Sequence, residues 1–163
     1  MDPIFRRWFY AGAAAAVVLG LWLAHLWSAE HQVQRHSEHF LRQVEKRNWR
    51  AIGDFVAPDY HDDWGDDRTR LLERLRLTLR LFSSLTITTP NPPDVQIAAD
   101  SAIWKAKIQI AGRGPEITPG MIERVNRLTA PFELRWRKES WRPWDWRLVQ
   151  VRNPELKLPA DFW

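Results

Sequence analysis

Residues 40–60 read FLRQVEKRNWRAIGDFVAPDY, and two short helical patterns meet within this stretch. The first pattern consists of apolar or small side chains at helical spacing: Val33, Ser37, Phe40, Leu41 and Val44. It predicts one face of an amphipathic helix over residues 30–48. The second begins at Trp49 and must stop before Pro58, whose ring cannot continue a helix. Two helices that meet at residues 47–49 can bury their apolar sides in one core.

After Tyr60 the spacing of the apolar residues is first helical and then mostly alternating. A third helix is predicted after Asp67, with a stripe formed by Leu71, Leu72, Leu75, Leu79 and Phe82. Alternating patterns then predict strands over residues 85–89, 95–99, 102–110, 132–137 and 146–151, with one helical stretch over 121–128. Helices followed by strands with one apolar face predict an α+β fold, in which a curved, mostly antiparallel sheet packs on two or three helices as a cone or roll.

The sequence before this region contains one long apolar segment. Residues 8–27 read WFYAGAAAAVVLGLWLAHLW, without a formal charge. About 20 residues at about 1.5 Å per residue span the bilayer core of about 30 Å. We therefore predict a transmembrane helix over 8–28. A cleaved leader and a buried helix are the alternatives, although cleavage after Ala24 or Ala29 would leave a tryptophan where a small residue is needed.

The charges beside this segment predict its orientation. Arg6 and Arg7 lie in residues 1–7, which we expect in the cytoplasm of a cell bounded by an inner membrane. A connecting helix over 29–48 and the remainder of the domain over 49–163 would then be extracytoplasmic, in a periplasm where there is one. The expected localisation is the inner (cytoplasmic) membrane.

Composition excludes several classes of protein. The chain has 163 residues and no cysteine, which rules out disulfides, zinc ribbons, iron–sulfur ligation and a cysteine nucleophile. Its net charge of +4 is too small for a nucleic-acid-binding field. We expect neither a nucleic-acid partner nor a cofactor.

Residues 30–153 resemble the nuclear transport factor 2-like superfamily. The features that carry the resemblance are Phe40–Val44 with Arg47-Asn48-Trp49, the segment Phe55–Tyr60, the long strand Ala102–Ile110 and the closing hairpin through Trp146–Val149. The resemblance implies a cone-shaped α+β domain of the kind found in ketosteroid isomerase, polyketide cyclases and many non-enzymatic modules. The helical stretch near residues 120–128 departs from the simplest hairpin of this family.

Enzymes of this superfamily place an acid or base, and often a phenol, inside the cone. The candidate pocket residues here are Tyr60, His61, Asp62, Asp63 and Asp100. Burial would raise a carboxyl pKa and suit it to acid–base chemistry. Five aspartates lie within residues 59–67, a density that suits a hard cation such as calcium, but their spacing is not that of an EF-hand. The favoured interpretation of this stretch is a solvated loop in which Asp66 or Asp67 caps the next helix.

Three histidines, His31, His36 and His39, suggest a metal site but offer no third ligand on their helix. The simpler interpretation is a polar helix face close to the membrane. We therefore predict no metal site.

The last hairpin is rich in tryptophan and arginine. The candidate partner-binding residues are Arg135, Trp136, Arg137, Trp141, Arg142, Trp144 and Trp146. These residue types are enriched at interface hot spots, although they also pack on one another across strands. The favoured function is a membrane-anchored, non-catalytic module that binds a protein partner, assembles an envelope complex or pairs with a second copy. The alternative is a tethered ligand binder or an isomerase-, cyclase- or dehydratase-like enzyme that uses the cone.

Overall fold

The computed structural model describes residues 16–20 and 28–157. Residues 16–20 are helical. No helix within the described ranges is long and apolar enough to cross a bilayer. The predicted span over 8–28 falls outside these ranges except for residues 16–20 and 28.

Three helices follow in the predicted order: α2 (Ala29–Glu45), α3 (Trp49–Phe55) and α4 (Arg68–Arg80). Each begins at a side chain that accepts a hydrogen bond from the first turn. Ser28, Asn48 and Asp67 are these caps, so the predicted capping role of Asp67 is confirmed. Glu45 at the end of α2 also accepts a hydrogen bond from the backbone of Ile87, at 2.6 Å, which fixes α2 to the strands.

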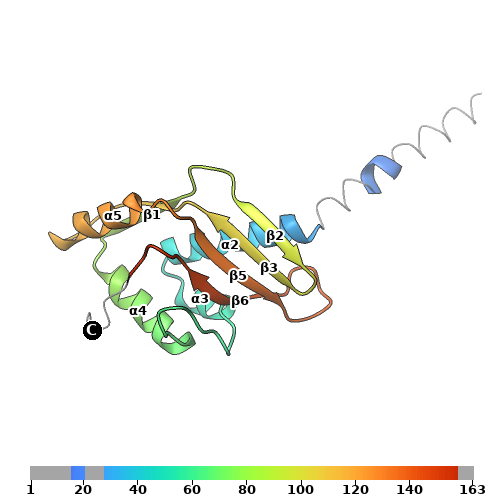
Figure 1. The fold of residues 1–163 in the computed structure, drawn as a ribbon, viewed down its shortest axis with the longest axis horizontal. Coiled ribbons are helices and arrows are strands. Elements are labelled where there is room, and N and C mark those ends of the chain that lie inside the picture. Colours follow the sequence, from blue (N-terminus) through green and yellow to red (C-terminus); the bar gives the residue numbers. More distant parts are fainter. Residues whose placement is uncertain (1–15, 21–27, 158–163) are drawn as a thin grey trace, which may run out of the picture.

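The strands form two antiparallel sheets (Figure 1). They are β1 (Ser84–Thr88), β2 (Asp94–Ala98), β3 (Ser101–Ala106), β4 (Gln109–Arg113), β5 (Phe132–Lys138) and β6 (Trp146–Arg152), with α5 (Ile117–Arg127) between β4 and β5. The larger sheet has the order β2-β3-β5-β6, and β1 pairs with β4. The predicted α+β class, with antiparallel strands packed on helices, is confirmed.

The single strand predicted over 102–110 was wrong, because the chain passes there from one sheet to the other. β3 pairs with β5 as far as Ala106, whereas β4 pairs with β1 from Gln109 onward. The free edge of β4 is occupied by Asn126 of α5, whose amide donates to the carbonyl of Ile110 at 2.9 Å and accepts from its N–H at 2.8 Å. A helix side chain therefore takes the place that a neighbouring strand would fill.

The alternation predicted for the last strand also fails after Leu148. A bulge leaves Val149 without a direct partner, because Trp136 pairs with Leu148 and Arg135 pairs with Gln150. Val151 consequently packs against the core, and Gln150 lies with Arg135 on the other face.

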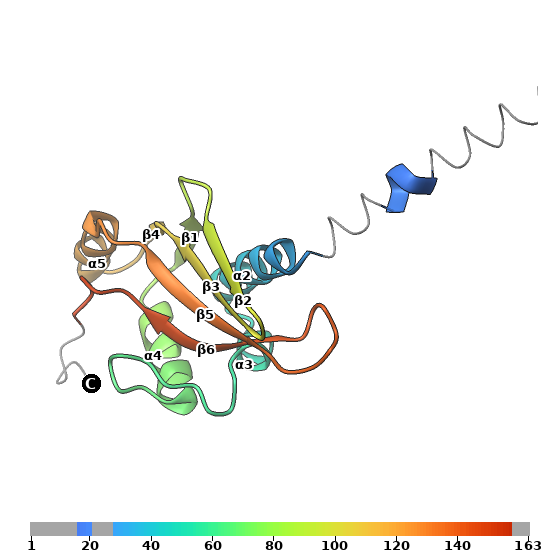
Figure 2. The same cartoon turned by 45° about the vertical axis from the view of Figure 1, so that its right-hand side comes forward.

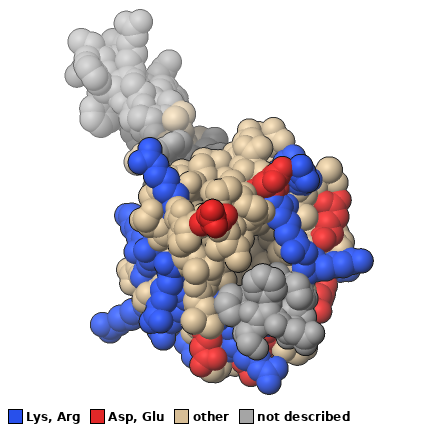
Figure 3. Space-filling view, turned by 90° about the vertical axis from the view of Figure 1, so that its left-hand side faces the viewer, with Lys and Arg blue, Asp and Glu red and all other residues tan. Residues whose placement is uncertain are grey.

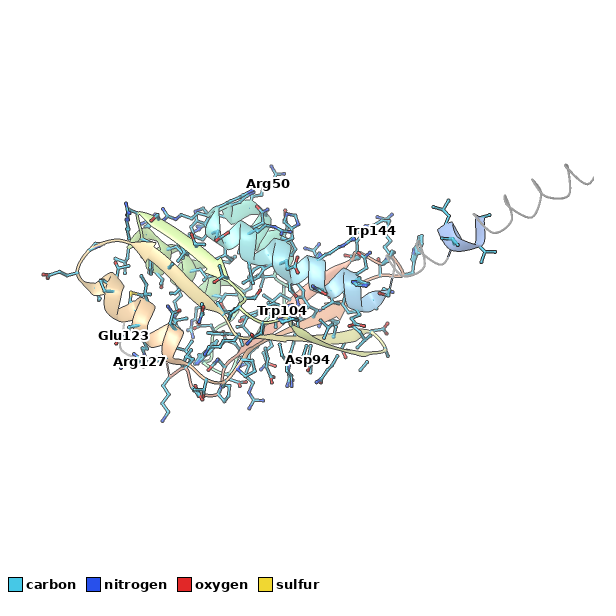
Figure 4. All side chains as sticks on the ribbon, turned by 90° about the horizontal axis from the view of Figure 1, so that it is seen from above. Arg50, Asp94, Trp104, Glu123, Arg127 and Trp144 are labelled. Carbon is cyan, nitrogen blue, oxygen red and sulfur yellow. The ribbon has the colours of Figure 1, made fainter. Side chains whose placement is uncertain are left out.

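Helices cover only one face of the larger sheet. In Figures 1 and 2, α2 and α3 lie behind it, and the face toward the viewer carries no helix. Trp104 lies between α2 and the sheet (Figure 4). The large side chains that are fully buried with it include Trp136, Tyr60, Ile52 and Leu148. The space enclosed by helices and sheet is thus occupied by aromatic and branched side chains.

Candidate functional site

Aromatic rings fill the inner face of the sheet. The His36 ring lies 4.6 Å from that of Phe55 and 5.0 Å from that of Trp136, both edge-to-face, and Phe40 completes the cluster. Burial lowers the pKa of His36 from 6.5 to about 4, so this imidazole is neutral at physiological pH. The prediction that His36 lies on the polar face of this helix was therefore wrong. Its helical spacing from Val33 and Phe40, which are both buried, was the sequence feature that could have placed it correctly.

Tyr60 and Asp62, both predicted as pocket residues, bond to one another. The Tyr60 hydroxyl donates to Asp62 Oδ2 at 3.0 Å, and Asp62 Oδ1 accepts from the backbone N–H groups of Trp64 and Asp66 at 3.0 and 2.9 Å. Burial, together with the Asp62 charge, raises the pKa of Tyr60 well above its ordinary value. The Asp62 carboxylate therefore stabilises its own loop, because the three groups that donate to it all belong to residues 60–66.

The rest of the acidic loop is also paired, and the predicted solvated loop was wrong for two of its residues. Asp62 and Asp66 are buried, and Asp66 forms an ion pair with Arg74 at 2.7 Å. Asp63 forms an ion pair with Arg152 at 2.8 Å and accepts a hydrogen bond from Gln150 Nε2, also at 2.8 Å. The partners on β6 were missed because the bulge that brings Gln150 to this face leaves no signal in the sequence.

The remaining pocket candidates lie apart from these. Asp100 sits in the exposed β2–β3 turn, where its carbonyl accepts from the N–H of Lys138 at 2.8 Å. His61 faces a hollow of about 380 Å³ on the outer side of the sheet, which Asp59, Ile103, Arg135 and Gln150 also line. The structure does not bring the five candidates together in one cavity.

Arginines define the charge of that outer hollow. Arg137 binds both carboxylate oxygens of Asp59, at 2.8 and 2.9 Å, and also Glu139. Hydrogen bonding to Arg137 lowers the pKa of Asp59. Arg135 Nε is buried without a hydrogen-bond partner among the described residues. Arg137 is therefore paired within the hollow, whereas the Nε–H group of Arg135 is free to donate to a partner.

A second hollow of about 390 Å³ lies between α3, α4 and the β5–β6 loop. Arg68, Arg147, Asp54 and Glu139 contribute to it. Arg68 donates to the carbonyl of Gly53 at 2.9 Å, so it joins α4 to α3. Charges of both signs line this hollow, which gives it no clear preference for one class of ligand.

The structure divides the predicted partner-binding residues into two groups. Trp136 and Trp146 are buried, with 1% and 3% of their surface exposed, because both point to the core side of the sheet. These two residues were wrongly placed at a binding surface. Trp141 and Trp144 are 85% and 60% exposed in the β5–β6 loop, with Arg142 between them. Arg135 and Arg137 lie on the outer face.

The described histidines of α2 have different surroundings. Within residues 16–20 and 28–157, no three histidine, aspartate or glutamate side chains come together as metal ligands. His39 is exposed and within 2.8 Å of Gln43, while His36 is packed among rings.

Comparison with known proteins rests on solved structures. A nuclear transport factor 2-like superfamily protein from Salmonella enterica serovar Typhimurium matches with a TM-score of 0.59 and 14% identity, over 83% of this chain and 96% of that one. Hexachlorocyclohexane dehydrochlorinase LinA-type3 from Novosphingobium barchaimii matches with a TM-score of 0.57 and 10% identity, over 76% and 84%. The domain has the nuclear transport factor 2-like fold.

A third match is to a longer protein, of which this chain spans only a part. Bd1075 from Bdellovibrio bacteriovorus gives a TM-score of 0.57 with 7% identity over 75% of this chain, which spans only 38% of that one. No protein-family model and no curated protein matches this sequence. At these identities the likeness shows the nuclear transport factor 2-like fold alone.

Proposed function

We propose that this chain is a single-pass membrane-anchored module that is not a catalyst, and that its nuclear transport factor 2-like domain binds a protein partner on the extracytoplasmic side. The apolar segment 8–27 and the basic pair before it support the anchor and its orientation. The hollow on the outer side of the sheet supports the binding role.

The filled inner face of the sheet carries this proposal. An enzyme or ligand binder that used the cone would need an accessible hollow with polar groups directed into it. Here Trp104 and Trp136 occupy that space, and the Tyr60–Asp62 pair is engaged with its own loop. Two hollows of the described surface, one on the outer side of the sheet and one beside α3 and α4, are open to solvent.

The outer hollow is the surface proposed to receive the partner. Ile103 supplies an apolar side chain and Arg135 an unsatisfied donor, beside the Arg137–Asp59 ion pair. An apolar centre with arginine at its edge is typical of protein interfaces. The chemistry favours a partner segment that combines an apolar side chain with a carboxylate.

The alternative is an enzyme of the kind named among the structural neighbours, one of which is a dehydrochlorinase and another a putative dehydratase. The neutral imidazole of His36, on the inner side of the sheet, is a group suited to accept a proton. Substrate access to it would require Phe55 and Trp136 to move, because their rings lie against it.

Photocrosslinking of the full chain in its membranes tests the proposal. A photoreactive residue in place of Ile103 should give one discrete adduct, whereas the same group at Glu123 in α5 should give none. Arg135→Ala should abolish the adduct and Arg127→Ala, an exposed arginine of α5, should preserve it. An adduct at twice 19.3 kDa would identify a second copy as the partner. Absence of a specific adduct at Ile103 would contradict the proposed surface.

A further inference from the structure

The loop that joins β5 and β6 presents two indole rings to solvent on a hydrogen-bonded turn. Trp141 is the most exposed large apolar side chain in the described part of the chain, and Trp144 is also exposed. Backbone bonds close the loop, with Glu139 N donating to Asp145 O at 2.9 Å, and Trp146 Nε1 donates to Pro143 O at 2.9 Å. The two exposed indoles therefore lie on a loop whose ends are joined by hydrogen bonds.

This turn lies at the end of the domain where α2 begins. Figure 2 shows the β5–β6 loop beside the first part of α2, and Figure 4 places Trp144 there, with Glu123 and Arg127 at the opposite end. The hairpin also contacts the middle of α2, where the Trp136 ring of β5 lies 5.0 Å from the His36 ring. The opposite end is shown in Figure 3, where Lys and Arg side chains lie along both flanks among a few acidic ones.

The sequence before α2 decides what faces this turn. Residues 8–27 end one residue before Ser28, the cap of α2. His36 is eight residues beyond Ser28, about 12 Å along a helix axis. If residues 8–27 are in a bilayer, as the proposed function requires, the covalent link holds this end of the domain against the lipid headgroups.

We propose that the hairpin tip, residues 141–144, binds the surface of the membrane that holds the anchor. Tryptophan is enriched at membrane interfaces, where one end of its ring is in an apolar environment and the other is in contact with water. The loop also contains two acidic residues, Glu139 and Asp145, and Glu139 is paired with Arg137. Because its charges are mixed, binding should depend on the indoles and only weakly on anionic lipid. Such a contact would fix the orientation of the domain on the membrane.

The absence of cysteine allows a direct test in the full chain. We suggest Arg142→Cys with a nitroxide label, in liposomes of phosphatidylcholine with and without phosphatidylglycerol. Glu123→Cys is the control at the far end. Collision with oxygen, which concentrates in lipid, is compared with collision with an aqueous nickel chelate.

The label at position 142 should be shielded several-fold from nickel and accessible to oxygen, in both lipid mixtures, while the label at 123 stays accessible to nickel. Adding Trp141→Ser and Trp144→Ser to the Arg142→Cys chain should remove the shielding. Equal nickel access at both positions, or shielding from both quenchers as in a protein–protein contact, would overturn the proposal.

The anchor itself is tested separately by alkaline carbonate extraction of the same liposomes. A chain that stays in the pellet with an accessible label at 142 overturns the hairpin inference alone. A chain that is extracted overturns the anchor and the hairpin inference together.

Discussion

His36 shows how a single position can depend on its surroundings. Its folded-state pKa of about 4 lies below the ordinary value of 6.5, because rings on α3 and β5 exclude water from it. The stabilisation that depends on neutral His36 is thus complete above pH 6.5 and is lost as the pH falls toward 4. We expect His36→Gln to remove about 2 kcal/mol of this acid-dependent loss, after allowance for partial exposure. Denaturation at pH 7 and pH 4.5 measures it, with His39→Gln as the control that retains the loss; an unchanged pH dependence in His36→Gln would contradict the assignment.

Asp62 is the second residue whose role the surroundings decide. It accepts three hydrogen bonds in a buried loop, so Asp62→Ala leaves three donors without their acceptor. We expect the free energy of unfolding to fall by about 3 kcal/mol, and by less in Asp62→Asn, which keeps one acceptor oxygen. Chemical denaturation checks both variants. A loss in Asp62→Ala no greater than that in Asp67→Ala, which removes only a helix cap, would argue against this role.

Among the elements, the attachment of α5 to β4 is a feature that periodicity does not reveal. Both polar groups of the Ile110 backbone bond to Asn126. Asn126→Ala should lower the free energy of unfolding by about 2 kcal/mol and speed hydrogen exchange at the Ile110 amide. Asn91→Ala, in the exposed loop before β2, is the control and should leave that amide unchanged. Unaltered exchange in Asn126→Ala would show that the side chain does not hold the strand edge.

The same elements show what the sequence can and cannot predict. Helical spacing and caps were enough for α2, α3 and α4, because each has an apolar face and a polar residue at its start. The passage from β3 to β4 and the bulge in β6 were missed, because both depend on pairing with strands far away in sequence. The candidate site was harder still. Trp136 of β5 and Trp141 of the following loop both lie next to an arginine in the sequence, and only the fold separates buried Trp136 from exposed Trp141.

In the molecule as a whole, the filled interior makes the stability depend strongly on Trp104 and hardly at all on Trp144. Trp104→Ala should lower the free energy of unfolding by about 4 kcal/mol, because the fully buried ring leaves a cavity. Trp144→Ala, at an exposed loop position, should change it by less than about 0.5 kcal/mol. Thermal or chemical denaturation compares them. A small loss in Trp104→Ala would mean that the inner face is open, and it would favour the ligand-binding alternative.

We propose that residues 8–28 anchor the chain in the membrane and leave its folded domain outside the cytoplasm. Labelling of single cysteines in intact bacterial cells with a membrane-impermeant maleimide tests this most directly, using Glu123→Cys in the domain and Asp2→Cys in the N-terminal segment. We expect position 123 to be labelled in intact cells, whereas position 2 should be labelled only after the membrane is opened. Labelling of position 2 alone, or recovery of the whole chain in the aqueous fraction without detergent, would contradict it.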